Sequence, residues 1–255
     1  SSGIKITSPT PDGYTNISNS IIYGNGDSTQ IFFSDAADPT LNIEYSNIQN
    51  GLDLVADGIG VINWGDGNID VDPHFVYPDS TDYRLLASSL CINAAHPDST
   101  DNDGTRLDMG VYPYLNTYSG PTWYVEPAGN DTTGTGASDS PFASIQSAIN
   151  FATTTSDSVT VAAGTYIENI NFRGRNIKVV GADRETTIID GNANGTVVVF
   201  ENLNNEFNHQ YQDAVLKSFT ITNGGGYEGS GIKLHSFSSP TLSDLIISDN
   251  VSTSG

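Results

Sequence analysis

Short apolar runs that end in Asn, Asp or Gly return at a constant interval along this chain. Two pairs of runs show it: SIIYGN (20–25) with NIQNG (47–51), and FTITN (219–223) with LIISD (245–249). Ile22 and Ile48 are 26 residues apart, and so are Ile221 and Ile247. A strand that returns at such an interval is typical of a β-solenoid, in which each repeat forms one coil. We therefore predict an all-β fold built of stacked coils.

Polar turns separate the strands in the first part of the chain. The predicted strands there are 17–23, 30–33 and 41–48, and the residues between them include Gly, Asn, Asp and Pro, which favour turns. The repeat disappears between residues 63 and 114. We predict that this stretch is the irregular end of a solenoid, where polar and aromatic residues cover the last coil.

The region after residue 121 begins with a predicted strand at 123–125 and then carries a helix signal. Ser140 is suited to cap a helix N-terminus, and Pro141 to its first turn. Apolar residues follow at helical spacing: Phe142, Ile145, Ile149 and Ala152. We predict one short amphipathic capping helix near residues 141–153, which covers the opening edge of a second solenoid. Further strands are predicted at 159–161, 164–166, 177–180 and 187–191.

Several motifs occur in an order that is known from other proteins. In the second part they are PFASIQSAI (141–149), GTYIENI (164–170), TIIDG (187–191), FTITNG (219–224) and SPTL (239–242). Through them, residues 122–250 resemble the opening of a right-handed parallel β-helix of the pectin-lyase-like superfamily, of the kind found in large bacterial secreted and cell-surface proteins. Residues 17–114 resemble the closing part of such a protein, through GNIDVDPHF (67–75), DYRL (82–85), DG (103–104) and DMG (108–110).

The resemblance implies three segments. Residues 1–114 would be the closing coils and cap of one β-helix, 115–121 a connector, and 122–255 the opening cap helix and first coils of a second. A tandem array of β-helix domains would place an end before a beginning, and so would a repeating subunit cut at an arbitrary phase. Exposed strand edges recruit partners, so we expect copies of the chain itself, or adjacent β-helix domains, to stack end to end.

Composition narrows the partners and the location. The chain has 30 Asp and Glu against 9 Lys and Arg, a net charge of −21, which makes nucleic acid and anionic membrane surfaces poor partners. We therefore expect no nucleic-acid partner and no membrane insertion. Its single cysteine, Cys91, allows no intrachain disulfide. No apolar run is long enough to cross a bilayer. The acidic, Ser-, Thr-, Asn- and Gly-rich composition is typical of secreted or cell-surface proteins, so we expect an extracellular location.

Catalysis is the less favoured interpretation. Enzymes that resemble this fold mostly cleave acidic polysaccharides, using clustered carboxylates, or calcium with a basic residue. This chain has no Asp-Asp pair, and its basic residues stand apart except Arg173, Arg175 and Lys178. A polyanionic substrate would also meet a strongly negative surface. We therefore assign no catalytic residue, and if there is an activity we expect that of a polysaccharide lyase.

One acidic loop, DNDGTRLD at 101–108, offers oxygen ligands around a glycine turn. We predict Asp101, Asp103 and Asp108 as calcium ligands, and calcium as the only cofactor. The loop does not complete an EF-hand, because Tyr112 stands where the bidentate Glu would be. The alternative is that these carboxylates accept hydrogen bonds from the backbone of the turn. A second acidic set lies at Asp66, Asn68, Asp70 and Asp72.

Together these features predict an extracellular, non-catalytic structural or adhesive protein. Its fold would be a right-handed parallel β-helix, since crossovers between parallel strands are almost always right-handed. It would form part of a tandem array or of a head-to-tail filament. The alternative is a module that binds or cleaves polysaccharide.

Overall fold

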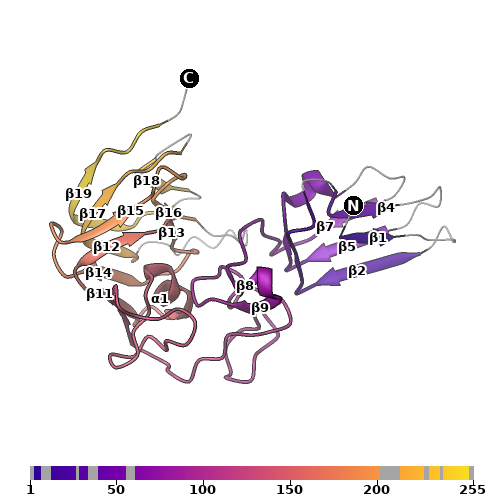
Figure 1. Cartoon of the computed structure of the whole chain (residues 1–255), viewed down its shortest axis with the longest axis horizontal. Helices are drawn as coiled ribbons and strands as arrows, with labels where there is room; N and C mark the ends of the chain where they lie inside the picture. The colour runs from indigo at the N-terminus through magenta and orange to yellow at the C-terminus, as the bar shows by residue number, and fades with distance from the viewer. Residues whose placement is uncertain are drawn as a thin grey trace. The chain divides into compact units, whose positions relative to one another are not determined.

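The computed structural model describes residues 3–6, 13–26, 29–33, 40–55, 61–201, 213–226, 230–235 and 238–252. In these ranges the protein is mostly β, with many parallel strands and one short α-helix (Figure 1). The chain divides into two compact units: unit 1 comprises Ser1–Leu85 and Ser89–Leu115, and unit 2 comprises Leu86–Ser88 and Asn116–Gly255. No helix among the described residues is long and apolar enough to cross a membrane.

Unit 1 contains stacks of short parallel strands. β1 (Ile4–Ile6) pairs with β4 (Ile31–Phe33), β2 (Tyr14–Ser18) with β5 (Thr40–Glu44), β5 with β7 (Val61–Trp64), and β3 (Ile21–Ile22) with β6 (Asn47–Ile48). β8 (Phe75–Tyr77) and β9 (Asp82–Leu85) form an antiparallel pair, and η1 (Gly51–Leu54) and η2 (Pro78–Ser80) are short 3-10 helices. Ile22 lies opposite Ile48, which confirms the pairing expected from their interval of 26 residues.

Two of the predicted strands in unit 1 are broken by a corner. Asn19 (φ 51°) separates β2 from β3, and Tyr45 (φ 46°) separates β5 from β6. A left-handed residue departs from the extended backbone of a strand, and at these two positions the strand is interrupted. The predicted strands 17–23 and 41–48 are therefore confirmed in position but wrong in being continuous.

The core of unit 1 consists of aliphatic side chains that stack at equivalent positions of successive strands. Its buried members are Ile17, Ile22, Ile31, Leu41, Ile43, Ile48 and Val55. Those in the middle of the stack are almost completely enclosed: Ile43 is 1% exposed and Ile48 is 0% exposed. Ile17 and Ile22, in the first strands, are each 8% exposed. The core is therefore buried throughout, including its members at the edge formed by β2 and β3.

Unit 2 contains a larger parallel arrangement. Its strands are β10 (Thr122–Val125), β11 (Ser158–Val161), β12 (Gly164–Ile167), β13 (Ile170–Asn171), β14 (Lys178–Gly181), β15 (Thr187–Asp190), β16 (Val198–Phe200), β17 (Val215–Thr222), β18 (Ile232–Leu234) and β19 (Thr241–Ser248). One sheet has the order β10-β11-β14-β17-β15-β12, with β19 also on β17, and a second has the order β13-β16-β18. Ile221 lies between Ile189 and Ile247, as the 26-residue interval predicts for the second pair.

The single α-helix, α1 (Ile145–Phe151), starts later than predicted. Ser144, not Ser140, is the N-cap, and its side chain accepts a hydrogen bond from the backbone N–H of Ser147. Phe142 instead bridges to Val125 in strand fashion, and its N–H donates to the carbonyl of Tyr124. Phe142 was predicted to lie in the first turn of the helix, but it is part of this extended segment.

All seven residues of α1 are buried, so the polar face of the helix does not meet solvent. Gln146 donates to the carbonyl of Asn171 (3.2 Å) and accepts from its N–H (2.7 Å). Asn150 donates to the carbonyl of Ala87 (2.9 Å). The polar side chains of Gln146 and Asn150 therefore form hydrogen bonds with backbone groups inside the unit rather than with water. The same contact holds Leu86–Ser88, part of the predicted first segment, in unit 2.

Aromatic rings form the core around α1. Phe142 stacks on Phe151 with ring centroids 5.4 Å apart, and Phe151 stacks on Trp123 at 5.7 Å. Tyr118 contacts Trp123 edge to face at 5.1 Å. Gly129 lies so close to this cluster that a Cβ there would overlap the carbonyl of Phe142. Large side chains and one close backbone approach therefore fill the start of unit 2.

Candidate functional site

The predicted calcium ligands lie in one loop of unit 1 and bind backbone groups. Asp108 is buried, and its two carboxylate oxygens accept from the N–H groups of Asn93 and Tyr114, each at 2.7 Å. Asp101 accepts from the N–H of Asp108 at 2.9 Å. Burial raises the pKa of Asp108 to about 7, although its two backbone hydrogen bonds act in the opposite direction. The loop is thereby held together by its own carboxylates.

Asp103 has the same kind of role, because its Oδ1 accepts from the N–H (3.0 Å) and the hydroxyl (2.8 Å) of Thr105. Across the described residues, no group of three or more His, Cys, Asp and Glu side chains is arranged to hold a metal ion. The alternative role of turn acceptor therefore has direct geometric support, and calcium binding stays a prediction. Titration calorimetry of the chain against an Asp103→Ala variant decides between them.

The second acidic set connects neighbouring strands of unit 1. Asn68 accepts from the N–H of Ser46 at 3.1 Å, 22 residues earlier in the chain. Asp70 accepts from the N–H of Asn50 at 2.9 Å. Asn68 and Asp70 thus accept from backbone donors at the turns of the preceding strand layer and join two layers of the unit.

Sequence reasoning missed two carboxylates that hold the start of α1. Glu168 accepts from the N–H groups of Ile145 (2.8 Å) and Gln146 (3.0 Å). Asp131 accepts from Ala143 N–H at 2.9 Å and, with the same oxygen, from the next N–H at 3.2 Å. Burial raises the pKa of Glu168 to about 7. No local pattern could reveal Glu168, because it lies 23 residues from the group it binds.

Two of the three basic residues that could have met an acidic substrate, Arg173 and Arg175, form hydrogen bonds inside unit 2. Arg173 donates to Asn150 Oδ1 at 2.8 Å. Arg175 donates to the carbonyls of Ile149 and Ala152. Both guanidinium groups thus anchor α1 and its C-terminal end. Of this cluster, the exposed Lys178 is the basic residue that a lyase mechanism could use.

The raised pKa values of Asp108 and Glu168 predict a pH dependence of stability. Their pKa values are about 7 in the folded protein, against about 4 for free carboxyl groups. Between these values the folded state binds more protons than the unfolded state, so the free energy of unfolding should fall as pH rises from about 4 to about 7. Urea unfolding at pH 5 and pH 8 measures the difference. The decrease should be smaller in an Asp108→Asn/Glu168→Gln variant, and an equal decrease in both proteins would contradict the assignment.

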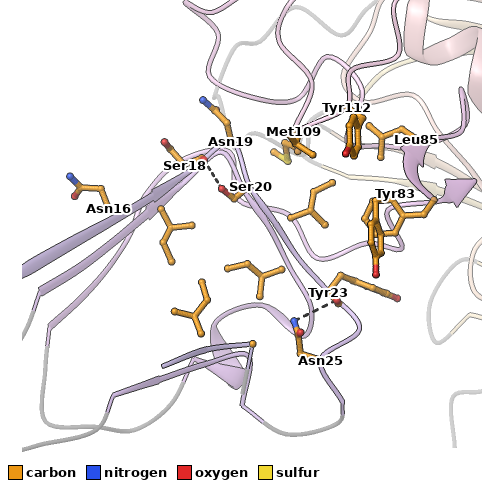
Figure 2. Close-up of a pocket in the computed structure, with 18 residues that line it drawn as sticks. Asn16, Ser18, Asn19, Ser20, Tyr23, Asn25, Tyr83, Leu85, Met109 and Tyr112 are labelled. Carbon is orange, nitrogen blue, oxygen red and sulfur yellow. Dashed lines mark hydrogen bonds between the residues drawn. The ribbon is translucent and has the colours of Figure 1, made fainter. Parts of the chain in front are cut away.

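A groove in unit 1 lies along the free edge of β2 and β3, with a volume of about 960 Å³ (Figure 2). Ile4, Ile17 and Ile22 line it from the core, and Tyr83 and Tyr112 from the irregular region. Tyr83 is 47% exposed and Tyr112 is 52% exposed. Figure 2 shows the side chain of Ser20 donating to the carbonyl of Ser18 (2.8 Å) beside it. The groove thus combines the open end of the unit 1 core with exposed aromatic rings.

The other open edge is β19 in unit 2. Among the described strands β19 pairs only with β17, so its second edge is free. Leu242 and Ile247 lie opposite Leu216 and Ile221, which are both 0% exposed. Leu242 is nevertheless 39% exposed and Ile247 53% exposed. Core-facing side chains are therefore partly uncovered at this edge, whereas Ile17 and Ile22 beside the groove of unit 1 are each only 8% exposed.

Comparisons with protein-family models, with curated proteins and with solved structures gave no match to this chain. The resemblance seen in the motifs stays an interpretation of those motifs. The groove of unit 1 and the free edge of β19 are the candidate functional sites, because exposed tyrosine rings line the groove and Leu242 and Ile247 are partly exposed at β19.

Proposed function

We propose that this chain is a structural or adhesive part of an extracellular right-handed parallel β-helix that extends by end-to-end stacking. The strands would be successive sides of coils, and the irregular stretch of unit 1 would cover one side of them. Its partners would be further coils of the same kind, either in a second copy or in a tandem array. The excess of acidic residues and the Ser-, Thr- and Asn-rich composition support an extracellular setting.

The pairing intervals support the coil interpretation. Tyr14 pairs with Thr40, and Val215 pairs with Thr241, each 26 residues further along the chain. Every pairing between the named strands is parallel except that of β8 with β9. A parallel strand needs a crossover, and repeated crossovers of similar length generate a coil.

One observation carries the proposal: both β2–β3 and β19 are edge strands with core-type aliphatic side chains and few charges. Natural edge strands are usually protected by Lys, Pro or inward-pointing charges. Residues 13–26 contain no charged side chain, although the chain has a net charge of −21. An edge that is left unprotected in so charged a protein is suited to receive another strand.

The proposal predicts elongated assemblies whose size grows with protein concentration. Sedimentation velocity should show association across the micromolar range, and negative-stain electron microscopy should show rods of constant width. Compact monomers at every concentration would argue against it. A longer native polypeptide with covalent neighbours would give the same rods without concentration dependence.

A polysaccharide-binding module is the second candidate, favoured by the tyrosines of the groove. Exposed aromatic rings stack on sugar rings, and Asn16 and Asn25 add amide groups beside them. A neutral glycan would suit the acidic surface better than a uronate. Affinity electrophoresis in neutral polysaccharides, with retardation lost in a Tyr112→Ala variant, would favour this candidate.

A further inference from the structure

We infer that the groove of unit 1 binds a neutral oligosaccharide and discriminates against uronates. Tyr83 and Tyr112 provide the faces on which sugar rings stack. Asp70 and Asp72, beside the groove, repel acidic sugars. This ligand assignment rests on the proposed polysaccharide-binding function and specifies its substrate class. The groove volume of about 960 Å³ lies near the upper end of the range for ligand pockets, which suits several sugar rings rather than one.

The lining of the groove is uncharged, although the chain is strongly acidic. None of the 18 described residues that line it is Asp, Glu, Lys, Arg or His, whereas the whole chain carries a net charge of −21. The carboxylate of a uronate would therefore meet no basic partner in the groove. A ligand that carries only hydroxyl groups needs no such partner, so the charge pattern favours a neutral glycan.

Tyr83 presents an exposed ring whose orientation is fixed by a neighbouring ring. It packs edge to face on Phe75, with ring centroids 5.3 Å apart. In the view of Figure 2, Tyr83, Tyr112 and Tyr23 lie on the same side of the groove. A ring that is already ordered loses little conformational freedom when a ligand stacks on it, and this favours binding.

Tyr112 lies in a segment that is anchored at both ends. On one side, the N–H of Gly110 donates to the carbonyl of Asn19 at 2.9 Å. On the other side, the N–H of Tyr114 donates to the buried carboxylate of Asp108 at 2.7 Å. Tyr112 itself is exposed, so the anchored segment presents its ring to solvent. Such a ring offers a large apolar face with a polar tip, which matches the apolar face and hydroxyl rim of a sugar.

Two asparagines of the lining offer complementary polar groups. Oδ1 of Asn16 accepts from Asn42 at 2.7 Å, so its NH₂ group is what it can offer a ligand. Nδ2 of Asn25 donates to Oε1 of Gln30 at 3.1 Å, so its Oδ1 is the group that can accept. Sugar hydroxyls both donate and accept, and they therefore match both asparagines.

A peptide is a less suitable occupant of this groove. An extended peptide binds a sheet edge through backbone hydrogen bonds. At the corner beside the groove, Asn19 already accepts from the N–H of His96 through Oδ1 (2.8 Å) and from that of Gly110 through its carbonyl (2.9 Å). Stacking on exposed rings requires no free backbone group, so a glycan can bind without displacing these contacts.

Hydrogen bonds between strand layers place Asp70 near the layer of Tyr23. Asp70 Oδ1 accepts from the N–H of Asn50 at 2.9 Å. The preceding residue, Gln49, donates its N–H to the carbonyl of Ile22 at 3.0 Å. Ile22 is followed directly by Tyr23, and both line the groove. Asp70 therefore stands two layers from the groove lining on the same turn of unit 1.

The electrostatics of Tyr23 agree with this placement. Burial, followed by the negative charges of Asp72 and Asp70, raises the pKa of the Tyr23 hydroxyl. Both carboxylates are exposed, so they also act on a ligand that approaches from solution. A uronate chain would be repelled by these two groups, whereas a neutral glycan would not.

Binding assays with matched oligosaccharides test the ligand class. Calorimetric titration of the full chain with cellohexaose, xylohexaose and mannohexaose should detect binding of at least one of them. Hexagalacturonate should bind at least about tenfold more weakly at low ionic strength. Tyr83→Ala and Tyr112→Ala should each weaken neutral binding by about tenfold. Tyr77→Ala is the matched control and should leave it unchanged, since Tyr77 is 67% exposed but does not line the groove.

A charge-neutralising variant tests the selectivity. Asp70→Asn/Asp72→Asn keeps the oxygens that accept from the N–H groups of Asn50 and His74. It should change neutral binding by less than about twofold and reduce the discrimination against hexagalacturonate at least about threefold. Equal binding of neutral and acidic hexamers by the native chain, or neutral binding that survives both tyrosine substitutions, would overturn the inference but leave the polysaccharide-binding candidate. Binding of none of these oligosaccharides would overturn both.

Discussion

An Ile221→Asp variant is expected to lose the folded structure of unit 2. Ile221 is 0% exposed and lies in register between Ile189 and Ile247. A carboxylate there would have no partner among aliphatic neighbours, and burying an unpaired charge costs several kcal/mol. That cost is comparable with the whole stability of a typical domain, about 5–15 kcal/mol. Circular dichroism and the soluble yield of the variant measure the effect.

Lys217→Asp is the matched control, since Lys217 is an exposed residue of the same strand. The same side chain should be tolerated there, with a change in the free energy of unfolding within about 0.5 kcal/mol. A soluble, cooperatively folding Ile221→Asp protein would show that this position does not face the core.

Truncating Phe142 should produce the largest loss of stability among the aromatic positions near α1. Its ring is 0% exposed and stacks on Phe151 at a centroid distance of 5.4 Å. Phe142→Ala removes the contacts of the ring and leaves a cavity, for which a loss of about 3–5 kcal/mol is expected. Gly129 packs against the backbone of Phe142, so the surrounding chain has little freedom to close the cavity. Urea denaturation followed by tryptophan fluorescence, with Trp123 in the same cluster, provides the measurement.

Ile167→Ala serves as the control, because the Ile167 side chain is 70% exposed in the same unit. It should change the free energy of unfolding by less than about 0.5 kcal/mol. If the two variants have equal stability, the stacked rings contribute no more than a surface contact.

Many strands of this protein could be predicted from the sequence, because a short run of aliphatic residues between turn residues marks each of them. Predicted strands at 159–161, 164–166, 177–180 and 187–191 correspond to β11, β12, β14 and β15. The interval of 26 residues also predicted which isoleucines face each other. Aliphatic residues bounded by turn residues carry this information within a few positions of one another.

The boundary of α1 shows where local signals fail. Ser140 and Pro141 have the right chemistry for a helix start, yet Phe142 bridges to Val125 and delays the helix. Local propensity is a weak preference, and a contact from a distant strand overrides it. The burial of Gln146 could not be predicted from local sequence either, because its hydrogen-bond partner Asn171 is 25 residues away.

The candidate site could be predicted only in part. The sequence showed that Asp101, Asp103 and Asp108 cluster around a turn, but not that Asp108 is buried and bound to Asn93 and Tyr114. It also predicted free edges that recruit partners. It could not show which side chains line them, because the groove brings together strands and irregular segments that are far apart in the chain.

The sequence by itself determined the class of secondary structure, the repeat interval and the acidic surface, since these depend on residue type and spacing alone. The tertiary structure decided where the strands turn at Asn19 and Tyr45, why α1 is buried on every side, and which backbone groups Asp108 and Glu168 hold. Each of these depends on a partner in another strand layer or in a distant segment. Such pairings have no local signature, because the energy that selects them comes from burial and hydrogen bonding in the assembled fold.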